Sequence, residues 1–338
     1  MLAQLFGKKT KQQGRVGIAV TPGKLSVVHL EKRKDAPHLL GCKVEDVESK
    51  KEVEAKLSHA VAQMELEDKQ CSYVLGPDEY SLHLIEAPKV EPEEMRAAVR
   101  WSVKDLLDMK IDDAAIDIFP VPDDAYRGRK MVYVVAAAKN RIQQIAEMVT
   151  NADLELAIID IPELAMKNIS NCFIEDSNGA AFMDLRLTGS TMNISHNGDL
   201  YLSRRINTQL APDVMQSLEW ENLKDRLVLE IQRSLDYFES QMSKGQINRI
   251  VIAQRQQDTE AMCTALDELL SAQVTALDLT SHINSKIELT PELQQQCAYA
   301  IGATMRGMKM QDAKQPDPAP ADPEVPPASP ATPTEEAA

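Results

Sequence analysis

The two halves of the chain repeat one pattern of short strands and tight turns, and this repeat limits the fold more than any other feature. In the first half, apolar runs predict strands at 15–20, 25–30 and 38–44. In the second half, the same order returns at 180–185, 191–195 and 200–206, with Asn197-Gly198 as a hairpin signal. Two meanders of this kind predict a duplicated architecture.

Each meander leads into alternating helices and strands. Apolar residues at helical spacing predict helices at 52–64, 223–242, 259–270 and 292–310. Apolar runs between them predict strands at 72–75, 250–253 and 274–279. Alternation of strands and helices after a meander is typical of an α/β protein, so we expect two α/β lobes.

A third unit interrupts the first half. It reads as a strand, a helix, two strands and a helix, at 81–85, 92–107, 115–121, 130–137 and 140–150. Pro92 suits the first turn of its first helix, and the acidic residues that follow suit the positive end of the helix dipole. We therefore expect an inserted α+β subdomain.

These patterns give the expected domain boundaries. The first lobe comprises 15–80 and 161–175, the inserted subdomain 81–160, and the second lobe 176–310, after a basic segment at 1–14 and before a tail at 311–338. The tail is rich in Pro, Ala and Glu and carries almost no large apolar residue, so we expect it to be disordered. The basic segment starts with apolar residues, which allows weak contact with an anionic membrane surface, but a frayed terminus is the simpler interpretation.

The charge and the cysteine pattern exclude several functions. A formal net charge of -15 argues against nucleic-acid binding, which needs clustered Lys and Arg. The five cysteines lie far apart, without a CxxC, and indicate idle reduced thiols rather than a disulfide framework or a zinc site. The six histidines show no metal-binding spacing, and no segment is long and apolar enough to cross a bilayer.

The order of elements and several short stretches resemble one family. They resemble the actin-like proteins with an inserted subdomain, namely the FtsA type and its pilus relative PilM, over roughly residues 16–310. The most specific stretch is 230–238, EIQRSLDYF, and weaker ones lie at 99–101, 134–139, 156–162 and 297–306. Within this family, the sequence resembles most the PilM-like proteins of mannose-sensitive haemagglutinin (MSHA) pilus systems.

The resemblance implies a fold and a role. The fold would be actin-like (ribonuclease H-like), with two lobes and an inserted βαββ subdomain. The protein would be cytoplasmic and would sit at the inner face of the cytoplasmic membrane. There it would bind the cytoplasmic N-terminus of a PilN-like inner-membrane protein and link it to the pilus motor. Trp101, the large aromatic residue of the inserted subdomain, is a candidate for partner contact, with burial in the subdomain core as the alternative.

The resemblance also places a nucleotide site, whose first phosphate loop falls at residues 19–24. Ala19 stands where the family carries a carboxylate, and Pro22 removes a backbone N–H that a phosphate would need. Gly23 and Lys24 remain as candidate phosphate ligands. The alternative interpretation of Lys24 is an ordinary solvent-exposed lysine in a turn.

The second loop and the nucleoside side are altered as well. Arg186 replaces a family glycine beside Asp184, and Gln254 stands where the family has a Gly-Gly turn. The remaining candidates for nucleotide contact are Asp184, Thr188, Gly189, Ser190, Glu230 and Arg233. Glu230 and Arg233 are equally consistent with an ordinary ion pair on a helix.

These changes predict a degenerate site and a scaffold rather than an enzyme, with no catalytic residue, no metal ligand and no cofactor. Residual binding of Mg-ATP leaves one alternative open, an ATP-responsive switch in which lobe closure controls partner binding. A sugar-kinase-like phosphotransferase would need an intact first loop, which the sequence lacks. A fourth hypothesis is the cytoplasmic part of a GspL-like secretion protein. That family continues into a membrane span, whereas this sequence continues into the Pro-rich segment at 311–338. The sequence leaves a homo-oligomer open.

Overall fold

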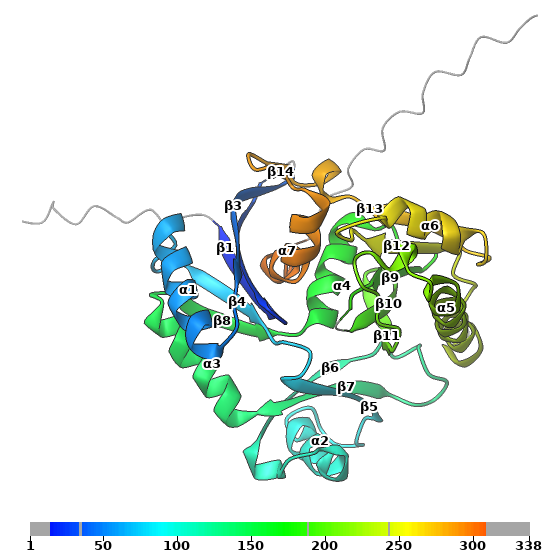
Figure 1. Cartoon of the computed structure of the whole chain (residues 1–338). Coiled ribbons are helices and arrows are strands. Elements are labelled where there is room, and N and C mark those ends of the chain that lie inside the picture. Colours follow the sequence, from blue (N-terminus) through cyan, green and yellow to red (C-terminus); the bar gives the residue numbers. More distant parts are fainter. Residues whose placement is uncertain (1–13, 34–35, 188, 243, 309–338) are drawn as a thin grey trace, which may run out of the picture.

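The computed structural model describes residues 14–33, 36–187, 189–242 and 244–308. The expected basic segment, apart from Gly14, and the expected disordered tail lie outside the described residues. Within them, the chain forms two lobes with a smaller sheet beside them (Figure 1).

The first lobe contains a six-stranded sheet with the strand order β14-β3-β2-β1-β4-β8. The meander expected in the first half forms its antiparallel part, and β4 and β8 continue it in parallel. The strands are β1 (Arg15–Thr21), β2 (Lys24–Lys32), β3 (Pro37–Asp46), β4 (Gln70–Val74), β8 (Glu155–Asp160) and β14 (Asn284–Ser285).

The second lobe contains a five-stranded sheet with the order β11-β10-β9-β12-β13. Here too an antiparallel meander is extended by two parallel strands. The strands are β9 (Ala180–Asp184), β10 (Ser190–His196), β11 (Asp199–Ile206), β12 (Arg249–Ala253) and β13 (Gln273–Leu277). The shared strand order of the two sheets confirms the duplicated α/β architecture predicted from the meanders.

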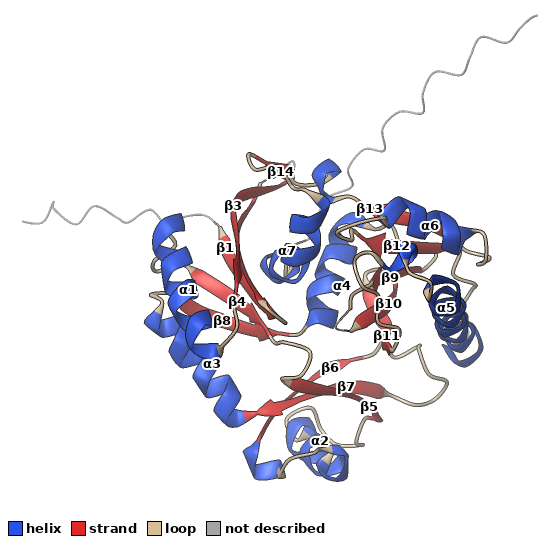
Figure 2. Ribbon diagram, in the orientation of Figure 1, coloured by secondary structure: helices blue, strands red, loops and turns tan. Residues whose placement is uncertain are grey.

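The helices form three layers around the two sheets (Figure 2). α1 (Lys50–Met64) and α3 (Lys139–Asn151) cover the outer face of the first sheet. α5 (Trp220–Met242) and α6 (Thr259–Asp267) cover the outer face of the second. Between the sheets lie α4 (Pro162–Phe173) and α7 (Pro291–Thr304), which pack against each other.

Two glycines allow the central helices to pack closely. A Cβ atom on Gly17 of β1 would lie 1.9 Å from the Ala300 carbonyl oxygen of α7. A Cβ atom on Gly302 of α7 would lie 2.1 Å from the Ala165 carbonyl oxygen of α4. The C-terminal helix therefore packs on the first-lobe sheet, although we expected it in the second lobe, and it ends at Thr304 rather than at residue 310.

The inserted unit is a three-stranded sheet in the order β5-β7-β6, from β5 (Tyr80–Glu86), β6 (Ala114–Pro120) and β7 (Met131–Ala138). α2 (Met95–Ser102) packs on it through Val99. This helix is shorter than the expected 92–107, because residues 92–94 form turns and the helix begins at Met95.

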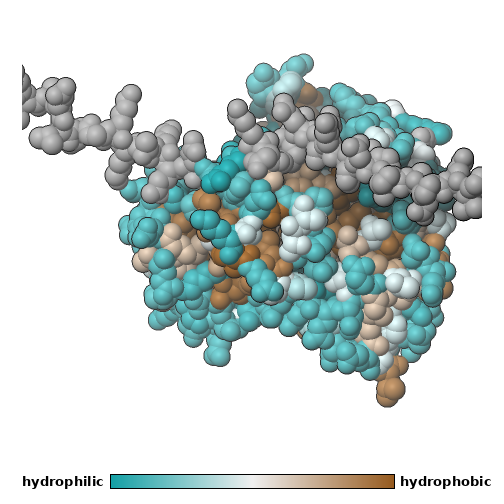
Figure 3. All heavy atoms as spheres, turned by 90° about the horizontal axis from the view of Figure 1, so that it is seen from above, coloured by the Kyte–Doolittle hydropathy of each residue, from teal (hydrophilic) through white to brown (hydrophobic). Residues whose placement is uncertain are grey.

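The inserted unit also ends earlier than the expected boundary at residue 160. β8 pairs with β4 in the first-lobe sheet, and α3 packs against α1. No helix among the described residues is long and apolar enough to cross a membrane. The described surface seen from above is mainly hydrophilic, with hydrophobic residues gathered in separate patches (Figure 3).

Candidate functional site

The first candidate phosphate loop is an ordinary hairpin turn between β1 and β2. Thr21 pairs with Lys24 in the antiparallel register, and Gly23 adopts a φ of 79°, the left-handed region that favours glycine. The Lys24 ammonium forms an ion pair with Asp46 at the end of β3, at 2.7 Å. The ammonium group is therefore already engaged within its own sheet.

The second candidate loop begins with a buried ion pair. Asp184 ends β9 with 2% of its surface exposed, and Arg186 Nε donates a hydrogen bond to its Oδ2 at 2.6 Å. Arg186 Nη2 donates to the Gln295 carbonyl oxygen of α7, also at 2.6 Å. The guanidinium group lies 4.2 Å from the ring centroid of Tyr299, close enough for a cation–π contact.

Electrostatics favour the charged state of this arginine. Burial lowers the pKa of Arg186, but the Asp184 carboxylate, together with Tyr299 and Cys297, more than offsets burial, so the pKa lies above its ordinary value. A positive group thus stands beside Asp184, which the resemblance marked as a candidate for nucleotide contact. The long Arg186 side chain, which replaces a glycine of the family, is folded back onto Asp184 of this lobe and onto α7.

Two further candidates of this loop lie in the described structure, and Thr188 lies outside it. The Ser190 hydroxyl is fully buried and accepts a hydrogen bond from the Arg186 backbone N–H at 2.9 Å. Gly189 has a φ of 126°, so a side chain at this position would strain the backbone. The hydrogen bond between Arg186 and Ser190 therefore connects the two sides of this loop.

A second buried arginine completes this cluster. Arg255 follows β12 and has 1% of its surface exposed. It donates hydrogen bonds to the carbonyl oxygens of Leu185, at 2.9 Å, and Ala211, at 2.7 Å. Sequence reasoning singled out the preceding Gln254 and missed Arg255, because nothing in the polar run 254–257 distinguishes a buried arginine from exposed neighbours.

The candidates on α5 form a separate pair. Arg233 Nη1 lies 3.5 Å from Glu230 Oε1, one helical turn away, and both side chains are partly exposed. Such a pair is the ordinary i, i+3 contact of a helix surface. No group of three or more His, Cys, Asp and Glu side chains suited to a metal ion occurs among the described residues.

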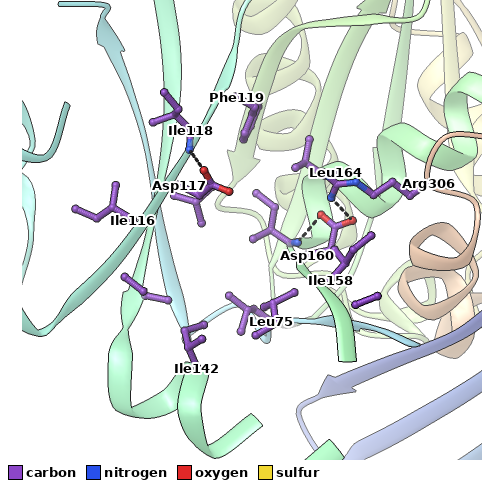
Figure 4. Close-up of a pocket in the computed structure, with 16 residues that line it drawn as sticks. Leu75, Ile116, Asp117, Ile118, Phe119, Ile142, Ile158, Asp160, Leu164 and Arg306 are labelled. Carbon is purple, nitrogen blue, oxygen red and sulfur yellow. Dashed lines mark hydrogen bonds and ion pairs between the residues drawn. The ribbon is translucent and has the colours of Figure 1, made fainter. Parts of the chain in front are cut away.

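A different site lies between the inserted sheet and the first lobe. It is a groove with a volume of about 440 Å³, bordered by β6 on one side and β8 on the other (Figure 4). Each of these strands is at the edge of its sheet within the described structure. Apolar side chains from several elements line the groove: Leu75, Phe119, Val135, Ala137, Ile142, Ile158, Ile159, Ile161 and Leu164.

Two carboxylates mark the polar part of this groove. Asp160 is buried, accepts a hydrogen bond from the Ile161 backbone N–H at 3.0 Å, and pairs with Arg306 at 3.3 Å. Burial raises the pKa of Asp160, and Arg306 opposes this rise. Asp117 of β6 is exposed and accepts a hydrogen bond from the Ile118 backbone N–H at 3.0 Å (Figure 4). Its carboxylate also pairs with Arg96 of α2, at 3.0 Å.

Trp101 does not line this groove. It lies at the C-terminal end of α2 with 71% of its surface exposed, so the alternative of burial in the subdomain core is wrong. An exposed tryptophan is uncommon and is enriched at protein interfaces. Its role in partner contact stays a prediction.

No family model matches the sequence, and no curated protein matches it. Solved structures do match. A PilM–PilN type IV pilus biogenesis complex gives a TM-score of 0.68 at 15% identity, covering 87% of this chain and 98% of that chain. A protein of actin-like ATPase fold and unknown function from Bacteroides thetaiotaomicron gives 0.49 at 11%, covering 81% and 93%. The cytoplasmic domain of EpsL, an inner-membrane component of the type II secretion system of Vibrio cholerae, gives 0.48 at 7%, covering 88% and 100%.

The first of these similarities extends over nearly the whole of both chains. Together with the duplicated strand order, it shows that the fold is actin-like α/β, as the resemblance implied. At 15% identity the similarity shows the fold and leaves the function to be argued from the sites.

Proposed function

We propose that this protein is a scaffold of a type IV pilus assembly machine and binds the cytoplasmic N-terminal segment of a PilN-like inner-membrane protein. The groove between β6 and β8 is the observation that carries the proposal. The similarity to a structure of a PilM–PilN complex supports the choice of partner. In this proposal the protein is cytoplasmic and acts at the inner face of the cytoplasmic membrane. The sequence stretches quoted above favour the MSHA-type (MshI-like) branch.

The groove suits an extended peptide. Two edge strands offer backbone N–H and C=O groups, so a peptide entering between them gains main-chain hydrogen bonds by strand addition. The apolar lining then receives alternate side chains, because side chains of a strand alternate between its two faces.

The proposal includes a degenerate nucleotide site and no enzymatic activity. Arg186 and Arg255 support it, because their buried guanidinium groups bind Asp184 and the protein's own carbonyl oxygens. A nucleotide phosphate would need to displace these contacts, at the cost of leaving buried polar groups unpaired. The ATP-responsive switch is the competing hypothesis.

The direct test is binding of a fluorescent peptide that carries the N-terminal cytoplasmic sequence of a PilN-like protein from the same genome. We expect saturable binding to the full chain, measured by fluorescence anisotropy. Ile158→Asp places a charge in the apolar lining and should weaken binding at least tenfold. Leu269→Asp makes the same kind of change at an exposed apolar residue of the second lobe and serves as the matched control.

Two results would overturn the groove as the binding site: equal binding by the Ile158→Asp variant, or equal losses in both variants. Thermal unfolding with and without excess Mg-ATP separates the scaffold from the switch. A ligand at a hundredfold excess over its Kd adds about 2.7 kcal/mol to the native state. We expect no shift of the midpoint, and a shift that Asp184→Ala removes would favour the switch.

A further inference from the structure

Two cysteines that are 255 positions apart in the sequence meet in the fold. Cys42 lies on β3 and Cys297 on α7, and their Sγ atoms are 3.0 Å apart. Cys42 is partly exposed and Cys297 is buried. No local spacing links these two positions, and the cysteine pattern alone predicted five idle thiols.

We propose that Cys42 and Cys297 form a reversible dithiol–disulfide couple, a redox modification site that ties α7 to the first-lobe sheet. A disulfide bond is about 2.05 Å long, so the two sulfur atoms need to approach by only about 1 Å. β3 and α7 already pack against each other, and the approach needs no rearrangement of the fold.

The oxidant in this proposal is a hydroperoxide. The Cys42 thiolate attacks the peroxide, the O–O bond breaks, and the products are a sulfenic acid on Cys42 and one water or alcohol molecule. The Cys297 sulfur then attacks the Cys42 sulfur, the S–O bond breaks, and a second molecule of water leaves. Overall, two thiols lose two electrons and two protons. A low-molecular-weight dithiol reverses the reaction by thiol–disulfide exchange.

The surroundings distinguish Cys42 from the other thiols. The hydrogen bond between Cys42 and Cys297 lowers the pKa of Cys42, which favours its reactive thiolate. Burial raises the pKa of Cys71 and Cys263 to about 12 and that of Cys172 to about 11. The exposed partner of the pair is thus the thiol best placed to react first.

The disulfide bond would constrain a helix that also contacts the second lobe. α7 also carries Gln295 and Tyr299, which hold the Arg186 guanidinium of the second lobe. Oxidation would therefore fix the helix that holds Arg186 to β3. A cross-link that closes a loop of this length strongly restricts the unfolded chain, so the oxidised protein should unfold at a temperature about 5 °C or more above that of the reduced protein.

The test uses the full chain treated with hydrogen peroxide, then denatured and alkylated with iodoacetamide. Intact mass should show a monomer with two alkyl groups fewer than the dithiothreitol-reduced sample. Peptide mapping should find Cys42 linked to Cys297. The loss should be absent in Cys42→Ser and Cys297→Ser and should persist in Cys172→Ser, the control at another partly exposed thiol.

Because Cys297 is buried, its variant can fail to fold, and the partly exposed Cys42 keeps the test decisive. The proposal is overturned if all five thiols of the wild-type protein remain open to alkylation after oxidation. A disulfide between two chains, or one that survives in the Cys42→Ser variant, overturns it as well. None of these results depends on the partner peptide, so the outcome is separate from that of the proposed function.

Discussion

The buried pair of Asp184 and Arg186 gives the sharpest prediction, because each charge compensates the other away from solvent. Arg186→Met keeps much of the apolar volume of the side chain and removes its charge and its donors. Asp184 would then remain buried without the partner that now lies 2.6 Å away. The Gln295 carbonyl oxygen would lose a donor, and Tyr299 would lose its cation.

The magnitude follows from the burial of both partners. Removing one member of a buried ion pair costs about 3–5 kcal/mol, because the other charge is left uncompensated. For a chain of this size that corresponds to a fall of the unfolding midpoint by roughly 5–8 °C. Removing both charges should be milder, so Asp184→Asn combined with Arg186→Met should cost clearly less than the sum of the single changes.

Urea unfolding followed by circular dichroism gives the three free energies of unfolding. The matched control is Arg233→Met, which breaks the exposed pair with Glu230 and should change stability by no more than about 0.5 kcal/mol. A cost below about 1 kcal/mol for Arg186→Met, or strict additivity in the double variant, would refute the inference that Arg186 compensates the buried charge of Asp184.

Two further predictions concern the fold. Gly302→Ala should destabilise the protein by about 2 kcal/mol or more in urea unfolding, since its new Cβ atom meets the Ala165 backbone, whereas Gly245→Ala in open space should not. Burial lowers the pKa of His29 from 6.5 to about 4. Between these two pH values the unfolded chain binds a proton that the native state does not bind. Stability should therefore fall by about 1–2 kcal/mol between pH 6.5 and pH 4, after allowance for the partial exposure of the ring, and His29→Gln should flatten this dependence.

The meanders could be predicted from sequence because their signals are local. Apolar runs separated by turn residues specify strands and hairpins without knowledge of distant partners, and both three-strand units appear within two residues of their expected limits. The sheets to which β8 and α7 belong could not be predicted from local signals. β8 pairs with β4, although the inserted subdomain lies between these two strands in the sequence. α7 belongs to the second half of the sequence but packs on the first-lobe sheet. Such contacts depend on packing between remote segments.

The candidate sites show the same difference between local signals and contacts of remote segments. The resemblance placed candidate loops at residues 19–24 and 184–190, and the structure shows a turn within each range. The burial of Arg255, the approach of Cys42 to Cys297 and the groove between β6 and β8 each need two elements that are far apart in the chain. Short-range patterns carry no information about such pairs, so single-sequence reasoning could not find them.

α7 links these separate features. Its Cys297 meets Cys42 of the first-lobe sheet, and its Gln295 and Tyr299 hold Arg186 of the second lobe. Just beyond its end, Arg306 pairs with Asp160 in the lining of the groove. Contacts of this one helix and its immediate continuation thus reach both lobes and the groove.

The last of these contacts can be tested by pH. Burial raises the native-state pKa of Asp160, and Arg306→Ala should raise it further by removing an opposing charge. A carboxyl group whose native pKa exceeds its unfolded value binds protons that the unfolded chain releases, so stability falls as pH rises through this interval. The variant should therefore lose stability relative to the wild type at pH 7, by about 1–2 kcal/mol because Arg306 is itself 46% exposed, and lose little at pH 4. An equal loss at both pH values in urea unfolding would show that Arg306 acts through packing rather than through the buried carboxylate of the groove.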